Sequence, residues 1–385
     1  MTPAGRQREA CLELAWRAAF SPGLIGRLVR KHGSMKAVLE LSPARYEPLT
    51  GRSRRPPPVR PLAAPAGVEV VTWHDRRYPE RLRRLFDPPA AIFVRGRGEL
   101  LAALDRLPLV AVVGARGPSG YGLEMTSVVV ADLVRAGVGI VSGLALGIDA
   151  AAHRAAVRTL AQGPCRGPAP PVAVLGCGVG VVHPRSNAAL FERVAAAGLI
   201  VSEYWWRLPA QAWRFPARNR LIAALSDAVL VVEGKQTSGA KHTASFAVEL
   251  GCDVLAVPAE AGRPLAALPH QLLREGAGLC ESADDVIAAL PRARRPPAAT
   301  EAAAAARVGG DDRLVGPAAQ VMDVLRHEDS TVDELALRSG CGVAEVMVAV
   351  SRLEIEGLVE AAGAGRFRVV RRPGGPPPGP PPGGR

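Results

Sequence analysis

Residues 109–156 read LVAVVGARGPSGYGLEMTSVVVADLVRAGVGIVSGLALGIDAAAHRAA, within a chain of 385 residues. The opening run, 109–113, is apolar and rich in valine, which predicts a strand. Apolar residues then recur with helical spacing over 121–135, and Gly137 follows where helices often end in a left-handed residue. A second apolar run at 139–141 leads into another helical pattern. The stretch therefore predicts a βαβ unit with parallel strands.

The turns that follow these two strands are rich in glycine. They read Gly114-Ala115-Arg116 after the first strand and Ser142-Gly143 after the second. Because the strands run in the same direction, both turns should lie at one edge of the sheet, where open α/β sheets bind ligands. Glycine lets a ligand approach the backbone, free N–H groups favour anions, and arginine adds a planar cation. The pattern predicts a phosphate site, the alternative being a strand-to-helix turn with incidental glycines.

Two common nucleotide-binding signatures are absent. Gly114, Gly120 and Gly122 do not have the G-x-G-x-x-G spacing of a dinucleotide site, and the chain has no G-x-x-x-x-G-K-[ST] loop. We therefore expect no cofactor, and a nucleoside triphosphatase is disfavoured.

The composition limits which partners and which cellular compartment the protein can be expected to have. The net charge is +12, but residues 1–60 carry 12 basic and 4 acidic side chains whereas residues 111–290 carry 15 and 14. The positive charge indicates a polyanionic partner, but it does not show which part of the chain binds that partner.

Six cysteines form no C-x-x-C pair, so we expect no metal site and reduced thiols. No stretch of about twenty residues is continuously apolar, and charges interrupt the N-terminus, so a cytoplasmic protein without a membrane segment is expected.

Strand-like runs alternate with helical patterns on both sides of the central unit. Several parallel strands joined by helices and glycine-marked turns predict an α/β fold with a doubly wound parallel sheet. The further strands are predicted at 68–72, 91–94, 172–175, 199–201, 228–232 and 254–257.

Residues 205–220 concentrate aromatic and basic side chains. Three of the chain's five tryptophans and four arginines fall within these sixteen residues. Such a mixture is typical of single-strand binding, because bases stack on rings while guanidinium groups contact phosphates. Packing of each tryptophan in the core is the alternative, since large aromatic side chains are usually well buried.

The C-terminal part predicts a separate small unit of three helices and a hairpin, which indicates a winged helix. Thr331 and Glu334 have the spacing of a capping box at the start of the second helix. The would-be recognition helix, 343–356, carries three glutamates against Arg352 alone. Because phosphates would repel these carboxylates, a transcription regulator that acts through this helix is disfavoured.

Taken together, these motifs resemble the DNA-processing protein A family, DprA/Smf. The chain departs from the usual family pattern at Pro258-Ala259 and at Leu268-Pro269-His270. The resemblance covers about 68–289 and rests on residues 113–116, 142–153, 175–178, 202–204, 215–220 and 238–239.

This resemblance implies an extended Rossmann-like core without catalysis that binds single-stranded DNA and protects it. It further implies a homodimer that loads the RecA recombinase during natural transformation. The candidate DNA-binding residues are Gly114, Ala115, Arg116, Ser142, Gly143, Phe215, Arg218, Asn219, Arg220, Lys235, Ser238 and Gly239. The expected domains are a small helical domain of the SAM or helix-hairpin-helix kind at 1–50, a linker at 51–66, the DNA-binding domain at 67–290, a linker at 291–312, the winged-helix-like domain at 313–370 and a disordered tail at 371–385.

A nucleotide-processing enzyme on a related fold is the rival interpretation. Enzymes that cleave the N-glycosidic bond of nucleoside monophosphates carry a P-G-G-x-G-T-x-x-E loop. Here Thr243 is followed three residues later by Phe246, and the nearest carboxylate is Glu249, which disfavours that enzyme. Asp149 and His153, four residues apart on one helical face, form either a catalytic pair or a structural one.

Overall fold

The computed structural model describes residues 3–21, 23–41, 64–291, 317–355, 358–363 and 365–370. The chain divides into two compact units, Met1–Pro296 and Pro297–Arg385, and each is described by itself. Most of the first predicted linker (51–63), nearly all of the second (292–312) and the tail at 371–385 lie outside the described residues.

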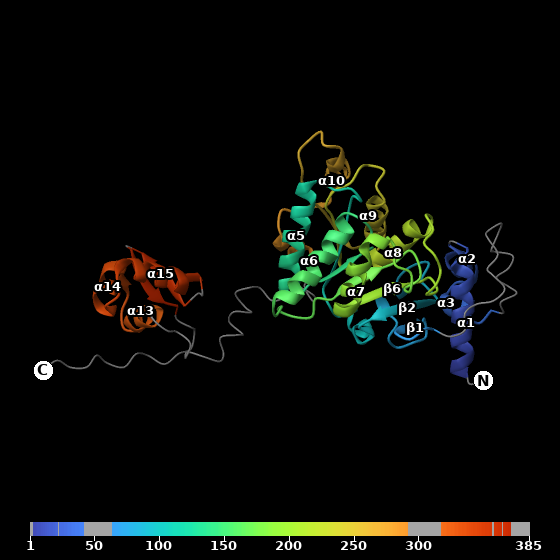
Figure 1. Cartoon of the computed structure of the whole chain (residues 1–385), viewed down its shortest axis with the longest axis horizontal. Helices are drawn as coiled ribbons and strands as arrows, with labels where there is room; N and C mark the ends of the chain where they lie inside the picture. The colour runs from blue at the N-terminus through green and yellow to red at the C-terminus, as the bar shows by residue number, and fades with distance from the viewer. Residues whose placement is uncertain are drawn as a thin grey trace. The chain divides into compact units, whose positions relative to one another are not determined.

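The first unit is built on a nine-stranded sheet in the order β1-β2-β6-β5-β4-β3-β7-β8-β9. Figure 1 labels β1, β2 and β6 of this sheet. The strands from β6 to β9 in this order are parallel, which confirms the doubly wound α/β fold. Because β3 pairs with β4 on one side and β7 on the other, the chain order changes direction beside β3, where such sheets bind ligands. The strands are β1 (Val68–Thr72), β2 (Ala91–Gly96), β3 (Leu109–Val113), β4 (Gly139–Ser142), β5 (Pro171–Val174), β6 (Leu199–Ser202), β7 (Ala228–Val231), β8 (Asp253–Ala256) and β9 (Gly278–Leu279).

One edge of this sheet differs from the all-parallel expectation. Strands β1 and β2 form an antiparallel pair, and β2 also runs antiparallel to β6. The residue pattern of a strand fixes its faces but not the direction of its neighbour, so the antiparallel edge was not predictable from periodicity. The two-residue strand β9 was too short to leave a pattern.

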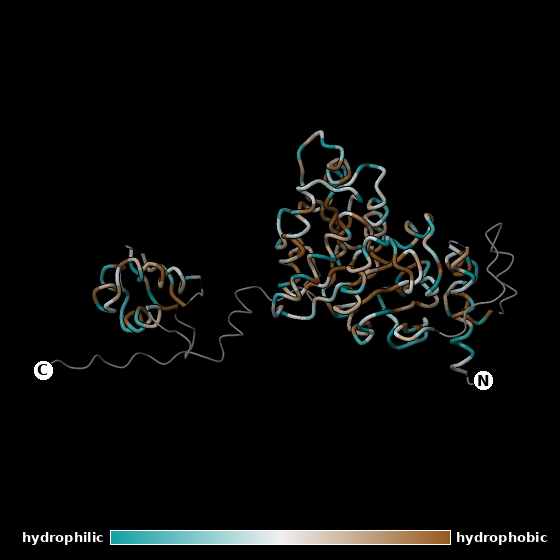
Figure 2. The backbone as a smooth tube through the Cα atoms, in the orientation of Figure 1, coloured by the Kyte–Doolittle hydropathy of each residue, from teal (hydrophilic) through white to brown (hydrophobic). Residues whose placement is uncertain are grey.

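Helices cover both faces of the sheet because β3 is apolar on both sides. Leu109, Ala111 and Val113 pack with residues of α8 and α9, whereas Val110 and Val112 pack with residues of α5 and α6. In the tube coloured by hydropathy, apolar segments of the first unit gather toward its inside and polar ones toward its outside (Figure 2). The helices are α4 (Glu80–Arg83), α5 (Gly120–Arg135), α6 (Ile148–Gln162), α7 (Ala188–Ala197), α8 (Arg214–Leu225), α9 (Ala240–Glu249), α10 (Ala267–Arg274) and α11 (Ala283–Ala289).

Three N-terminal helices, α1 (Pro3–Ala18), α2 (Leu24–His32) and α3 (Met35–Leu39), belong to the same compact unit as the sheet. Their buried side chains form one cluster with Ala90 and Ala91. Trp16 of α1 lies outside that cluster and packs edge-on against Trp205, with ring centroids 5.4 Å apart. The N-terminal helices are therefore attached to the residues that precede α8.

The second unit is a winged helix, as predicted. Helices α13 (Pro317–Leu325), α14 (Val332–Ser339) and α15 (Val343–Ile355) pack beside a sheet in the order β10-β12-β11, made of Ser330–Thr331, Arg366–Val369 and Val359–Gly363. The predicted capping box is present: Thr331 Oγ1 accepts from the Glu334 N–H, and Glu334 Oε2 accepts from the Thr331 N–H. On the outside of α15, Met347 and Val348 are exposed apolar side chains, which offer no hydrogen-bond donors to a phosphate.

Within the described ranges, no helix is both long and apolar enough to span a bilayer. The same ranges contain no group of three or more histidine, cysteine, aspartate or glutamate side chains placed to hold a metal ion.

Candidate nucleic-acid interface

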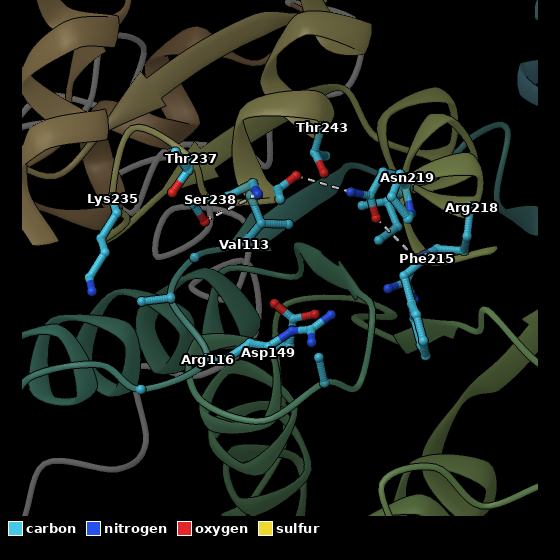
Figure 3. Close-up of a pocket in the computed structure, with 18 of the residues that line it drawn as sticks. Val113, Arg116, Asp149, Phe215, Arg218, Asn219, Lys235, Thr237, Ser238 and Thr243 are labelled. Carbon is cyan, nitrogen blue, oxygen red and sulfur yellow. Dashed lines mark hydrogen bonds between the residues drawn. The ribbon is translucent and has the colours of Figure 1, made fainter. Parts of the chain in front are cut away.

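A cavity of about 670 Å³ opens at the carboxyl edge of the sheet, beside β3 and β7 (Figure 3). It brings together the turn after β3, the first turns of α8 and the turn that precedes α9. Of the twelve candidate residues, the cavity is lined by Gly114, Ala115, Arg116, Phe215, Arg218, Asn219, Lys235, Ser238 and Gly239.

Tight packing shapes the turns around this cavity. A Cβ at Gly114 would lie 2.7 Å from Cγ1 of Ile148 and 2.9 Å from the carbonyl oxygen of Glu233, so the turn after β3 requires glycine here. Asn219 Nδ2 of α8 donates to the Gly239 carbonyl at 3.1 Å, which ties α8 to the turn before α9 (Figure 3). The three segments therefore form one rim rather than independent loops.

Arg116 and Phe215 lie next to each other on this rim. The guanidinium carbon of Arg116 is 5.6 Å from the centre of the Phe215 ring, within cation–π range. Arg116 and Lys235 are both exposed, and no carboxylate of the described residues lies within ion-pair distance of either. The cavity thus offers two cations available to an anionic ligand and a half-buried aromatic ring between α8 and the turn after β3.

Arg218 has a different role from these exposed cations. Its side chain is only 4% exposed, and Nη1 donates to the carbonyl oxygens of Gly143 and Val174. Burial lowers the pKa of its guanidinium, an effect opposed by the carboxylate of Asp149. Arg218 lines the cavity, but its hydrogen-bonding capacity is directed into the protein.

Asp149 and His153 are both buried against the sheet. Asp149 Oδ2 accepts from the Gly143 N–H at 3.1 Å; burial raises the pKa of this carboxyl, and Arg218 opposes the rise. Burial lowers the pKa of His153 to about 4, so its imidazole is neutral at physiological pH. His153 does not line the cavity, and this geometry favours the structural interpretation of the pair.

Three of the candidate residues are not brought to the cavity. Ser142 is fully buried and its hydroxyl donates to the Val112 carbonyl, while Gly143 lies behind the Arg218 guanidinium. Arg220 forms a bidentate pair with Glu203 at 2.7 and 2.6 Å and lines a separate cavity beside α2. Since helical residues advance by about 100°, Arg220 lies on a different face of α8 from Phe215, a distinction that the motif alone did not make.

Several of the large side chains in the aromatic and basic segment at 205–220 belong to the core. Trp205 and Trp206 are 2% and 3% exposed and pack on Phe93, with ring centroids 5.2 and 5.6 Å away. Arg214 is fully buried and donates to the carbonyls of Pro209 and Ala19. The stacking interpretation is therefore wrong for these two tryptophans, and Phe215 is the aromatic residue of this segment that lines the cavity.

Sequence reasoning missed Thr237 and Thr243, which also line the cavity. Both belong to the turn and first helical residues after β7, next to Ser238 and Gly239. Their position at a carboxyl end of a parallel strand was the available signal.

Known protein families match this chain over most of its length. A family model described as "DNA recombination-mediator protein A" matches residues 69–291, and one described as "DprA winged helix domain" matches residues 291–365. The DNA processing protein DprA of Bacillus subtilis (strain 168) is 34% identical over 225 residues, which cover 58% of this chain and 72% of that protein.

Two solved structures are similar as well. The X-ray structure of DNA processing protein A from Streptococcus pneumoniae has a TM-score of 0.53 and 32% identity, and the match covers 67% of this chain and 81% of that one. DNA processing protein A from Helicobacter pylori, whose structure is described for its single-stranded DNA binding mode, has a TM-score of 0.50 and 26% identity, with 57% and 93% covered.

Proposed function

The chain belongs to the DNA recombination-mediator protein A family, and from this premise we propose that it binds single-stranded DNA in the cavity beside β3 and β7. The observation that carries the proposal is the pairing of Arg116, an exposed guanidinium, with the ring of Phe215 at 5.6 Å. A single strand needs this combination, because its phosphates require cations and its unpaired bases require flat apolar surfaces. The single-stranded DNA binding described for the Helicobacter pylori relative supports it.

Each part of the cavity has a distinct role in this proposal. Arg116 and Lys235 contact phosphates, Phe215 stacks on a base, and the glycine turn at Gly114 lets the backbone approach the strand. Arg218 and Asn219 position these groups through the hydrogen bonds described above. Ser142, Gly143 and Arg220 are not among the proposed contacts.

A binding role without catalysis is favoured over a nucleotide-processing enzyme. Asp149 is the one carboxylate among the described residues that line the cavity, and it is engaged by the Gly143 N–H. Glu249, the nearest carboxylate after the turn at Gly239, lines the separate cavity beside α2 instead. A glutamate placed to act on a sugar is therefore missing from the described lining of the site.

We expect the protein to bind single-stranded DNA more tightly than blunt duplex of the same length. Stacking on Phe215 requires unpaired bases, while the phosphate contacts make the affinity fall steeply as salt rises. Fluorescence anisotropy with labelled oligonucleotides at several salt concentrations measures both effects, and a nucleotide-hydrolysis assay on the same samples tests the rival enzyme. Equal or tighter binding to duplex contradicts the proposal.

We also propose that the protein acts as a homodimer that protects incoming DNA in the cytoplasm and loads RecA onto it. This extension is supported by the family membership. Light scattering at micromolar concentration is expected to give twice the mass of the 385-residue chain. A monomer that still binds DNA would refute the dimer, and unchanged assembly of RecA on protein-coated strands would refute the loading role.

A further inference from the structure

A second cavity, of about 920 Å³, lies at the same edge of the sheet between the start of α5 and residues 258–266. It shares Leu265 with the proposed DNA cavity, so the two are neighbours. Glu233, two residues after the end of β7, lines the second cavity, whereas Lys235, two residues further, lines the first. None of the twelve candidate residues lines this second cavity.

Glu233 is a buried carboxylate with capacity left for a ligand. Its side chain is 3% exposed, Oε2 accepts from the Ser119 N–H at 2.8 Å, and Oε1 accepts from the Ser119 hydroxyl. Within the part of the chain that the structure describes, no arginine or lysine forms an ion pair with it. A carboxylate has about four acceptor sites, so roughly two remain for donors supplied from the cavity. A buried charge is costly without such donors.

The other walls of the second cavity suit a flat, uncharged ring. Tyr121 is 43% exposed, and its hydroxyl donates to the Pro258 carbonyl at 2.8 Å, so its ring lies between α5 and the loop that begins at residue 258. Arg263, which lines the cavity, is paired with Glu260 at 2.8 Å. With two carboxylates against one paired guanidinium, the lining disfavours a phosphate and favours a nucleobase that carries N–H donors.

We propose that the second cavity binds an unpaired base of the strand held in the first, and guanine in preference to the other bases. The inference rests on the proposed function. The Watson–Crick edge of guanine presents two adjacent donors, N1–H and the 2-amino group, which match a carboxylate. Adenine and cytosine present one amino group beside a ring acceptor, and thymine presents one N–H between two carbonyls. Stacking on Tyr121 holds the base while Glu233 reads its edge.

The test compares labelled thymine oligonucleotides of one length in which every third base is thymine, guanine, adenine or inosine. Full-length protein is expected to bind the guanine series about tenfold more tightly than the thymine or adenine series, the discrimination typical of one good base contact. Inosine, which lacks the 2-amino group, should lose most of this gain. In Glu233→Gln the ratio of the guanine and thymine Kd values should fall to about one.

Because Glu233 also caps the start of α5, two variants at Tyr121 provide an independent readout. Tyr121→Ala should abolish the guanine preference by removing the stacking surface, whereas Tyr121→Phe should retain it; circular dichroism reports whether each variant folds. Equal affinity for the guanine and thymine series, or a preference that survives both Glu233→Gln and Tyr121→Ala, overturns the inference. Failure to bind any of the oligonucleotides overturns the proposed function instead.

Discussion

Arg218→Met is expected to lower the free energy of unfolding by about 3–5 kcal/mol, the range for removing one member of a buried polar network. Methionine keeps much of the side-chain volume, so the loss is one of charge and hydrogen bonding. The carbonyls of Gly143 and Val174 would lose their guanidinium donor. Asp149, whose pKa burial raises, would lose the stronger of the two cations, Arg218 and Arg116, that oppose this rise.

Urea denaturation followed by tryptophan fluorescence measures this change. Arg116→Met is the matched control, because its guanidinium is exposed and surface substitutions usually change stability by less than about 0.5 kcal/mol. If the Arg218→Met protein is as stable as the control but binds DNA poorly, Arg218 contacts DNA, as the motif first indicated, and the structural role is wrong.

The case of Arg218 shows which parts of the site were predictable. Glycine turns after the parallel strands β3 and β7 had to meet at one edge, and they do, so Gly114, Arg116, Lys235 and Ser238 line one cavity. The side-chain directions within α8 were not predictable from a motif. Arg218 points into the protein and donates to the carbonyls of Gly143 and Val174, at the ends of β4 and β5. Arg220 points away from the cavity and pairs with Glu203.

The burial of the aromatic residues was also not predictable from the sequence. Trp205 and Trp206 precede α8, and both pack against Phe93 on β2. Trp205 also packs against Trp16 on α1. Such contacts between distant parts of the sequence decide whether a ring is a core residue or a binding surface. The second cavity was missed for the same reason. Glu233 and the start of α5 are joined by hydrogen bonds to Ser119, 114 residues away in the sequence, and residues 258–266 complete the lining.

Contacts with the N-terminal helices also fix α8 itself. Arg214, at the first residue of α8, donates to the Ala19 carbonyl at 3.1 Å, and its guanidinium lies over the rings of Tyr204 and Trp213. The Asp87 carboxylate accepts from the Gly26 N–H of α2, and the Asp87 backbone carbonyl accepts from Nε of Arg220. The helix that presents Phe215 to the cavity is therefore also held by contacts with the N-terminal segment.

Arg116→Ala and Phe215→Ala are expected to weaken single-strand binding by similar amounts but to differ in salt dependence. Each should cost about 1–3 kcal/mol, through loss of a charge-assisted contact for Arg116 and of a stacking surface for Phe215. If Arg116 neutralises a phosphate, as proposed, its loss should reduce the slope of log K against log salt by about one ion. Loss of Phe215 removes no charge, so the slope should stay close to that of the unsubstituted protein.

The contrast between the two slopes separates the proposed site from a general effect on structure. Arg207→Ala is the matched control for charge, since Arg207 is exposed and does not line the cavity; it should change the affinity little. Phe215→Tyr is the control for the ring and should retain most of the affinity, because a phenol stacks as a phenyl does. If the two alanine variants give the same slope, Arg116 does not meet a phosphate. If both unfold by circular dichroism, the two residues hold the rim together rather than bind DNA, and the site must be sought elsewhere.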